Sequence, residues 1–347
     1  MEKVQRIDDK LRQLDKPALA LATKLSLHNE DVLIVAAGFE DRSVEVVKRL
    51  VSGGIRGITV IILTYLPYLN ENRKDEIEKI CNEGKFKSIC IEYDRHNPAG
   101  IGDRFSYILQ GITSNIFIDI SAMSRLLITQ LIVFFGRQDF FRKMVILYSE
   151  ALHYPPSKNE VEVALKGQKN DEVYRAMFLS SGVFEVTIVP ELSSVALQGQ
   201  PIRLVLFPSF NMDQLPSLRS EIQPACFSII NGVPPLVENK WRTEAIKKLN
   251  HIDEILNREE FNVSTLDYRE TLSALSEIYN QHGDFERIII APVGSKMQAV
   301  AVGIFRTFMS DVQVAYPTPC KFAPPNNYTK EIRNIYELPL ESFGTIK

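Results

Sequence analysis

The sequence predicts an α/β protein with two tandem Rossmann-like, doubly wound lobes that contain parallel sheets, are related by internal duplication and are joined by a β arm. Two observations support this fold class. Apolar runs of strand length alternate with segments of helix length, which is typical of βαβ units. The second half of the chain also repeats the order of these elements. We expect an N-terminal lobe with a leading helix at residues 1–155, the arm at 156–200 and a C-terminal lobe at 201–347.

The N-terminal lobe contains five apolar runs, which indicate strands buried on both faces of a parallel sheet. A helix-like segment follows each of the first four runs, and the leading helix is expected within residues 1–28. The predicted strands are residues 31–39, 58–66, 87–94, 115–121 and 143–151.

Internal duplication is predicted from three pairs of segments that occur in the same order in the two halves. Residues 33–35 align with 204–206, residues 118–125 align with 289–296 at the same offset, and the strands that follow end in Tyr148 and Tyr316. A match at three points is harder to obtain by chance than a match at one.

The connector differs in pattern from the two lobes. Apolar and polar residues alternate in 160–165 and again in 184–189, which predicts two short strands. We expect these strands to form a β-hairpin-like arm that packs on a partner subunit or covers a sheet edge.

Composition excludes several classes of protein. Hydrophobic residues make up 45% of the chain and charged residues 24%, as in globular domains, and the formal net charge of −3 provides no global basic field for nucleic acid. The longest apolar run, residues 126–135, is too short to span a bilayer, and the charged N-terminus lacks a signal-peptide pattern. The four cysteines are scattered without a CxxC pair. We therefore expect a cytoplasmic protein with no metal, no cofactor and no membrane partner.

The strongest candidate site is the turn Gly294, Ser295 and Lys296, which follows a buried strand and opens a helix. Ligands of open α/β sheets bind at the carboxyl ends of the strands. A glycine there lets a ligand approach the backbone closely, and a helix N-terminus with a lysine favours binding of a phosphate group. The spacing of a Walker A loop is absent. The alternative is that Ser295 is an N-cap and Lys296 a solvated residue of the first turn.

Two loops of the N-terminal lobe have a similar character. The loop after the fourth strand offers an acid, hydroxyls and a cation, although its aspartate has the alternative role of fixing the turn. The loop after the first strand offers an arginine suited to bidentate phosphate contact, whereas its acids suit helix caps equally well. The candidate residues are Asp119, Ser121, Ser124 and Arg125 in one loop, and Gly38, Phe39, Glu40, Asp41, Arg42 and Ser43 in the other.

These turns resemble those of the CARF domain, the CRISPR-associated Rossmann fold. There the fourth strand runs into a Gly/Thr-rich turn that ends in lysine, and Gly294-Ser295-Lys296-Met297 is the better match. The turn Met123-Ser124-Arg125 departs from the pattern because it lacks glycine. The duplicated arrangement is similar to that of SAVED proteins. The resemblance implies that the two turns face one cleft between the lobes, and that this cleft binds a cyclic oligonucleotide.

We therefore predict a nucleotide-binding component of a bacterial antiphage defence system. Its expected partners are an anionic nucleotide-type ligand and a protein that carries the effector activity, and a homo-oligomer is compatible with the sequence. One alternative is an enzyme acting on a nucleotide or phosphorylated small molecule, for which Glu40, Asp41, Arg42 and His96 at strand ends are the candidates. The other alternative is a non-catalytic scaffold subunit of a defence complex.

Overall fold

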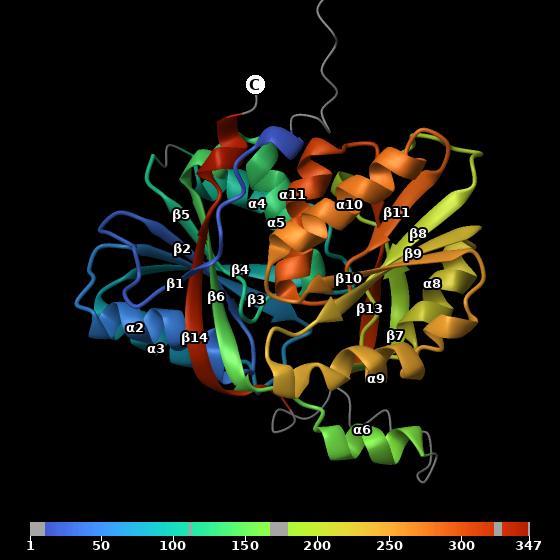
Figure 1. Cartoon of the computed structure of the whole chain (residues 1–347). Helices are drawn as coiled ribbons and strands as arrows, with labels where there is room; N and C mark the ends of the chain where they lie inside the picture. Colours follow the sequence, from blue (N-terminus) through green and yellow to red (C-terminus); the bar gives the residue numbers. More distant parts are fainter. Residues whose placement is uncertain (1–10, 111–112, 167–179, 323–327, 346–347) are drawn as a thin grey trace, which may run out of the picture. The chain divides into compact units, whose positions relative to one another are not determined.

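The computed structural model describes residues 11–110, 113–166, 180–322 and 328–345, and it divides into two compact units (Figure 1). The N-terminal unit comprises Leu14–Leu127, Phe134–Tyr154 and Tyr328–Lys347. The C-terminal unit comprises Met1–Gln13, Ile128–Val133 and Pro155–Asn327. Each unit is a mixed α/β structure in which strands and helices alternate along the chain, as the sequence predicts.

The N-terminal unit is built on a seven-stranded sheet with the order β1-β14-β6-β5-β2-β3-β4. The strands from β6 to β4 are parallel, whereas β14 and β1 extend the sheet in antiparallel pairs. Because β2 comes first along the chain, the parallel strands have the order third-second-first-fourth-fifth, which is typical of a Rossmann fold. The strands are β1 (Ala20–Leu21), β2 (Val32–Ala37), β3 (Thr59–Leu66), β4 (Lys87–Asp94), β5 (Ile116–Asp119), β6 (Met144–His153) and β14 (Lys330–Pro339).

The C-terminal unit contains a five-stranded parallel sheet with the order β10-β9-β8-β11-β12. With β8 counted first, the order is again third-second-first-fourth-fifth. A separate two-stranded antiparallel sheet pairs β13 with β7. The strands are β7 (Ser180–Thr187), β8 (Ile202–Leu206), β9 (Cys226–Val233), β10 (Arg258–Ser264), β11 (Arg287–Ala291), β12 (Gln313–Val314) and β13 (Tyr316–Phe322).

Helices connect successive parallel strands in both units. The α-helices are α2 (Glu45–Ser52), α3 (Lys74–Gly84), α4 (Ile101–Ile108), α5 (Arg125–Arg137), α6 (Lys158–Leu165), α8 (Gln214–Ile222), α9 (Trp241–Leu249), α10 (Tyr268–His282) and α11 (Lys296–Phe308). The 3-10 helices are η1 (Asp41–Ser43), η2 (Phe140–Lys143), η3 (Pro190–Leu192), η4 (Val237–Asn239), η5 (Ile252–Glu254) and η7 (Glu341–Thr345). In the described residues, no helix combines the length and the apolar composition that crossing a membrane requires.

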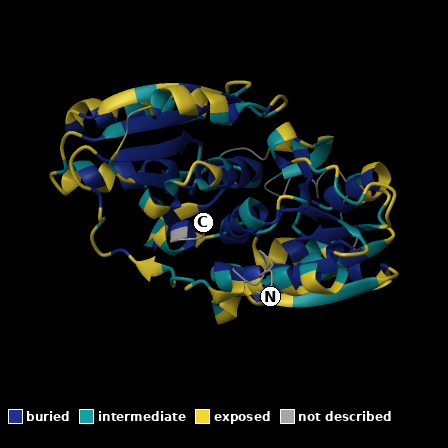
Figure 2. Cartoon of the chain, turned by 90° about the horizontal axis from the view of Figure 1, so that it is seen from above, coloured by how far each residue is buried: buried dark blue, intermediate teal, exposed yellow. Residues whose placement is uncertain are grey.

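The apolar runs form strands because both faces of the sheet are covered. Every residue of β2 is buried, and Figure 2 shows buried residues, in dark blue, along interior strands of the sheets. Helix α2 packs Val46, Val47 and Leu50 into one hydrophobic core, and α3 adds Ile77 and Ile80. Their spacing of three or four residues places them on one face of each helix. The outward faces of these helices carry the exposed residues, so the core lies between helix and sheet.

The predicted β-hairpin-like arm is wrong in its first half. Residues 160–165 belong to helix α6, which begins at a capping box in which Ser157 and Glu160 each bind the backbone of the other. This cap outweighs the alternation in the sequence, and Val161 alone is buried. The second predicted strand exists as β7, but its partner is β13 of the C-terminal unit. Residues 167–179 lie outside the described residues.

The ends of the chain also differ from the prediction. The C-terminal lobe was expected to extend to residue 347, but β14 pairs with β6 and completes the N-terminal sheet. A leading helix was expected across residues 1–28, but in the described residues the helical stretch ends at Gln13 and β1 follows at Ala20. Pairing between strands so distant in sequence has no local signature, which is why the boundary was misplaced. Internal duplication stays a prediction.

Candidate functional site

Each parallel sheet has one point where the strand order reverses. In the N-terminal unit it lies between β2 and β5, and in the C-terminal unit between β8 and β11. In open α/β sheets, ligands bind at the carboxyl ends of the strands next to such a point. Apart from His96, the predicted site residues lie at one of these two switch points, and each switch point is described in turn.

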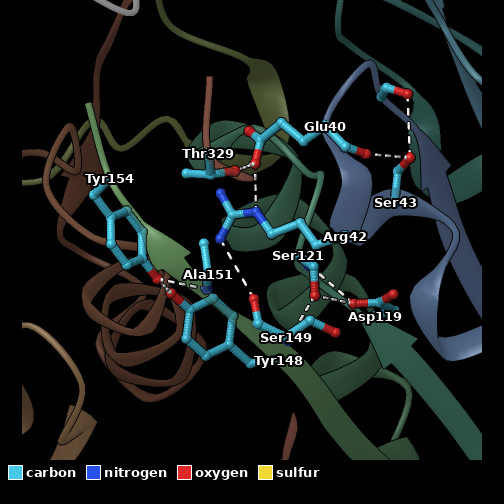
Figure 3. Close-up of polar contacts among 11 residues, drawn as sticks. Glu40, Arg42, Ser43, Asp119, Ser121, Tyr148, Ser149, Ala151, Tyr154 and Thr329 are labelled. Atoms are coloured by element: carbon cyan, nitrogen blue, oxygen red, sulfur yellow. Dashed lines mark hydrogen bonds and ion pairs between the residues drawn. The ribbon is translucent and has the colours of Figure 1, made fainter. Parts of the chain in front are cut away.

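At the N-terminal switch point, Arg42 forms a buried ion pair with Glu40 (Figure 3). The side chain of Arg42 is 6% exposed and that of Glu40 14%. Arg42 Nε donates to Glu40 Oε2, and the same oxygen accepts a hydrogen bond of 2.6 Å from the hydroxyl of Thr329. Thr329 lies just before β14, so a residue from the far end of the chain completes the pair.

The arginine is held in its charged form by these surroundings. Burial alone would lower the pKa of Arg42, but the Glu40 carboxylate, Tyr148 and Tyr154 together outweigh this effect and raise the pKa above its ordinary value. Arg42 Nη1 also lies 3.5 Å from the carbonyl oxygen of Ser149. Beside it, the hydroxyls of Tyr148 and Tyr154 are 3.0 Å apart, and burial raises the pKa of Tyr154. The positive charge of Arg42 is therefore compensated within the unit.

A second buried network joins the ends of β5 and β6. Asp119 Oδ1 accepts hydrogen bonds from the backbone N–H of Ser121, at 3.0 Å, and from its hydroxyl. The Ser121 oxygen in turn accepts a hydrogen bond of 2.8 Å from the backbone N–H of Ser149. Asp119 is 2% exposed and Ser121 is fully buried. The role that these contacts support is to fix the turn after β5, which is one of the two roles expected for Asp119.

The loop after β2 packs closely on the loop after β5. A Cβ placed on Gly38 would lie 2.9 Å from the Cβ of Ala122, so glycine permits this approach. The hydroxyl of Ser43 donates to the carbonyl of Glu40, at 2.8 Å, and Asp41 pairs with Arg73 at 2.5 Å. The ring of Phe39 packs edge-on against Tyr328, with 4.2 Å between centroids.

The turn that opens α5 is also held by contacts within the unit. Ser124 is the N-cap of α5 and accepts a hydrogen bond of 3.2 Å from the backbone N–H of Leu127. The backbone N–H of Ser124 donates to the hydroxyl of Tyr65 at 2.7 Å. Arg125, the first residue of the helix, is partly exposed.

At the C-terminal switch point, Ser295 and Gln298 cap the N-terminus of α11. Gln298 N–H donates to the Ser295 hydroxyl at 3.1 Å, and Ser295 N–H donates to Gln298 Oε1 at 2.7 Å. Ser295 is thus the N-cap of α11, which was the alternative to a ligand contact at this turn, and its contact with a ligand stays a prediction. Lys296 follows as the first helical residue and is partly exposed. The backbone N–H groups of Ser295, Gln298 and Ala299 are hydrogen-bonded within this turn, so the helix dipole is what makes this end of α11 favourable for an anion.

Two glycines bring the backbone against the Gln298 side chain. A Cβ on Gly294 would lie 2.3 Å from Gln298 Oε1 and 3.0 Å from the Cβ of Phe207. A Cβ on Gly232 would lie 3.5 Å from Gln298 Nε2 and 2.8 Å from Thr265 Cγ2. The Gln298 amide therefore lies between Gly294, in the loop after β11, and Gly232, near the end of β9.

The free end of this amide is a buried donor. Gln298 is 2% exposed, and its Nε2 has no hydrogen-bond partner in the part of the chain that the structure describes. The loop after β8 is different, because its polar groups bind one another: the Ser209 hydroxyl lies 2.6 Å from Gln214 Oε1, and Ser209 carbonyl accepts from Asn250 at 2.8 Å. Gln298 Nε2 is therefore a polar group near this switch point that could bind a ligand, and the buried Asn231 Oδ1 of β9 likewise has no partner among the described residues.

The structure brings the predicted residues together in two sets. The loops Gly38 to Ser43 and Asp119 to Arg125 meet in the N-terminal unit, and Gly294, Ser295 and Lys296 lie in the C-terminal unit. That the two turns share one cleft stays a prediction. Sequence analysis missed Gln298, although a serine followed three residues later by glutamine is a capping-box pattern. It also missed Thr329, for which the sequence holds no signal.

The remaining candidate of the enzyme hypothesis is His96. It is exposed in the loop after β4, and its backbone N–H donates to the Asp94 carboxylate at 2.8 Å. Within the described ranges, no group of three or more histidine, cysteine, aspartate or glutamate side chains is arranged to hold a metal ion.

No protein-family model and no curated protein matches the sequence. Among solved structures, the cytoplasmic domain of a prokaryotic cation chloride cotransporter is similar at a TM-score of 0.25 and 11% identity, over 84% of this chain and 95% of that chain. Phytolacca americana UGT2, complexed with UDP-2fluoro-glucose and pterostilbene, is similar at a TM-score of 0.23 and 12% identity, over 92% of this chain and 89% of that chain. The YdjI aldolase from Escherichia coli K12 is similar at a TM-score of 0.14 and 11% identity, over 82% of this chain and 90% of that chain. Similarities this low assign the chain to no family.

Proposed function

We propose that this protein binds an anionic, nucleotide-type ligand at the C-terminal switch point. The supporting observation is that α11 begins there, with Gly294 before its N-cap and Lys296 in the first turn. The positive end of the helix dipole and a lysine together favour a phosphoryl group. The N-terminal switch point supports such a ligand less well, because Arg42 is already paired with Glu40.

We propose in addition the role that the CARF and SAVED resemblance implies. In that role the protein is a cytoplasmic nucleotide-sensing component of a prokaryotic antiphage system, and a partner protein carries the effector activity. The turn Gly294-Ser295-Lys296-Met297 supports this proposal, as does the identical order of parallel strands in the two sheets, which is expected of duplicated halves. Arg125 is the cation that the N-terminal turn would contribute to ligand binding.

The first experiment separates sensing from catalysis. The purified protein is incubated with AMP, ATP, cyclic di-AMP and cyclic tetra-adenylate, and with adenosine as an uncharged control. Thermal shift and calorimetry measure binding, and chromatography of the nucleotides measures turnover. Stabilisation without turnover supports a sensor, whereas product formation supports the enzyme. Absence of both for every probe contradicts nucleotide binding and leaves the scaffold role.

The second experiment places the ligand in the fold. Lys296→Ala should weaken binding of the phosphorylated probes about 10-fold, because a charge-assisted contact contributes roughly 1.5–3 kcal/mol. Lys248→Ala is the matched control: Lys248 is exposed near the C-terminal end of α9, which precedes a strand and so lies at the opposite edge of the sheet. Equal affinity in both variants would remove α11 from the site. Arg125→Ala tests in the same way whether the N-terminal turn contributes.

A further inference from the structure

The buried amide of Gln298 is a hydrogen-bond donor that its surroundings leave unused. Its Nε2 has no partner among the described residues, although the side chain is 2% exposed. A buried donor without an acceptor destabilises a protein by roughly 1–3 kcal/mol, so a hydrogen bond from Gln298 Nε2 to a ligand would be favourable. Glutamate would cap α11 equally well, so the cap alone does not require an amide at this position.

The orientation of this amide is set by its other end. Ser295 N–H donates to Gln298 Oε1 at 2.7 Å, and a donor requires the oxygen there, so the NH2 group must be the end that turns away. Both ends of the amide lie near Gly232, where a Cβ would come within 3.5 Å of Nε2 and of Oε1. Gly232 belongs to β9, the neighbour of β8 in the sheet.

We propose that Gln298 Nε2 donates a hydrogen bond to a phosphoryl oxygen of the bound ligand and makes the site selective for that group. The inference rests on the proposed function, because it places this contact at the same switch point as Lys296. A phosphoryl group presents several acceptor oxygens, so one can meet the end of α11 while another meets the amide. A nucleoside without phosphate lacks the second oxygen and is excluded.

The substitution Gln298→Glu isolates this contact. Glutamate has the same shape and keeps an oxygen for the Ser295 N–H, but it replaces the NH2 donor with an oxygen that repels an anion. A negative charge in the first turn of a helix is favourable, whereas burying a carboxylate is unfavourable, so the melting temperature of the free variant is measured together with its affinity. We expect ATP and cyclic tetra-adenylate to bind about 10- to 100-fold more weakly under conditions in which the variant is folded.

A matched control removes the effect of net charge. Gln281→Glu makes the same change on the exposed surface of α10, near the end that precedes β11 and so at the opposite edge of the sheet. It should leave the affinity for both probes unchanged. As a second measurement, the side-chain amide resonance that is missing from the Gln298→Glu spectrum is followed in the unsubstituted protein, and it should shift when ATP is added.

The outcomes distinguish this inference from the function on which it rests. If the unsubstituted protein binds none of the phosphorylated probes, both are overturned. If Lys296→Ala weakens binding while Gln298→Glu binds as tightly as the unsubstituted protein, or the amide resonance does not move, only the role of Gln298 is overturned. Weakened binding in Gln298→Glu with normal binding in Gln281→Glu, together with a moving resonance, supports it.

Discussion

The two switch points share one order of parallel strands but differ in the partners of their polar residues. At the N-terminal one, Glu40, Arg42 and Thr329 bind one another, while the Ser149 hydroxyl has no partner among the described residues. At the C-terminal one, the capping box of α11 uses one end of the Gln298 amide and leaves the other end without a partner among the described residues. The difference teaches that strand order sets where the loops lie, while folding decides which of their charged side chains are already paired.

The largest expected effect is the loss of stability in Arg42→Ala. Removing one member of a buried ion pair leaves the other charge without compensation, which costs about 3–5 kcal/mol. Urea unfolding should show this loss in the N-terminal unit. Arg49→Ala is the control, because Arg49 is 41% exposed and its pair with Glu45 contributes about 0.3–0.5 kcal/mol. Equal losses in the two variants would mean that the buried pair of Arg42 stabilises the unit no more than an exposed pair.

The next largest effects are expected for glycine-to-alanine substitutions, which should change stability and ATP affinity differently at the two switch points. In Gly38→Ala, the new Cβ would lie 2.9 Å from Ala122 Cβ, so we expect a loss of about 1–3 kcal/mol in unfolding free energy. In Gly294→Ala, the new Cβ would lie 2.3 Å from Gln298 Oε1, so the flexible amide must move. This second variant should lose less stability but bind ATP more weakly. Unaltered ATP affinity in Gly294→Ala would argue against a site at α11.

Lys296→Ala should lower affinity without lowering stability, the reverse of Arg42→Ala. The expected change is about 10-fold in the dissociation constant for phosphorylated probes and under about 0.5 kcal/mol in unfolding free energy. Calorimetry and urea unfolding of the same preparation measure both. A variant that unfolds easily and binds normally would assign Lys296 to the structure of the unit.

The smallest effect is a pH dependence away from both switch points. Burial alone would raise the pKa of Glu260, but hydrogen bonds from Arg258, Lys247 and Asn231 lower it to about 2 from an ordinary 4.5. A lowered pKa stabilises the folded state above pH 4.5, and this contribution disappears as the pH falls toward 2. Because the side chain is 23% exposed, we expect at most about 1 kcal/mol.

Glu260→Gln should therefore make the melting temperature fall less steeply between about pH 4.5 and pH 2. The same acid titration applied to Glu254→Gln, an exposed residue of η5, serves as the comparison. Identical slopes for Glu260→Gln and the unsubstituted protein would show that the cluster contributes nothing to acid stability.

The sequence predicted the parallel cores well, because their signals are local. A strand covered on both faces must be apolar throughout, as in β2 and β3, and the turns that follow it are identified by position alone. Strand β14 could not be assigned in this way. Its partner β6 is far away in the chain, and no property of residues 330–339 by themselves selects that edge. Helix α6 was missed although Ser157 and Glu160 form a capping box that is visible in the sequence.

The positions of the candidate residues in the fold could be predicted, but their contacts could not, and their role in binding stays a prediction. Residue types after buried strands located both switch points, including Ser295 and Arg42. Whether a cation there is available depends on burial and on partners brought by folding, such as Thr329 for the Glu40–Arg42 pair. Those contacts arise from tertiary structure, so residue types alone cannot distinguish a compensated arginine from a ligand-binding one.

The position of β14 has a consequence for synthesis of the chain on the ribosome. The N-terminal sheet gains this strand, and Glu40 its Thr329 partner, only after residues 329–339 have left the exit tunnel. Until then, β6 is an edge strand whose backbone N–H and C=O groups on one side are unpaired. Such groups can form hydrogen bonds with strands of other chains, which leads to aggregation. The C-terminal unit, whose sheet ends at β12, has every strand of that sheet available earlier. The first unit to be translated is thus the last to be completed, and a message truncated before codon 330 should yield an aggregation-prone product.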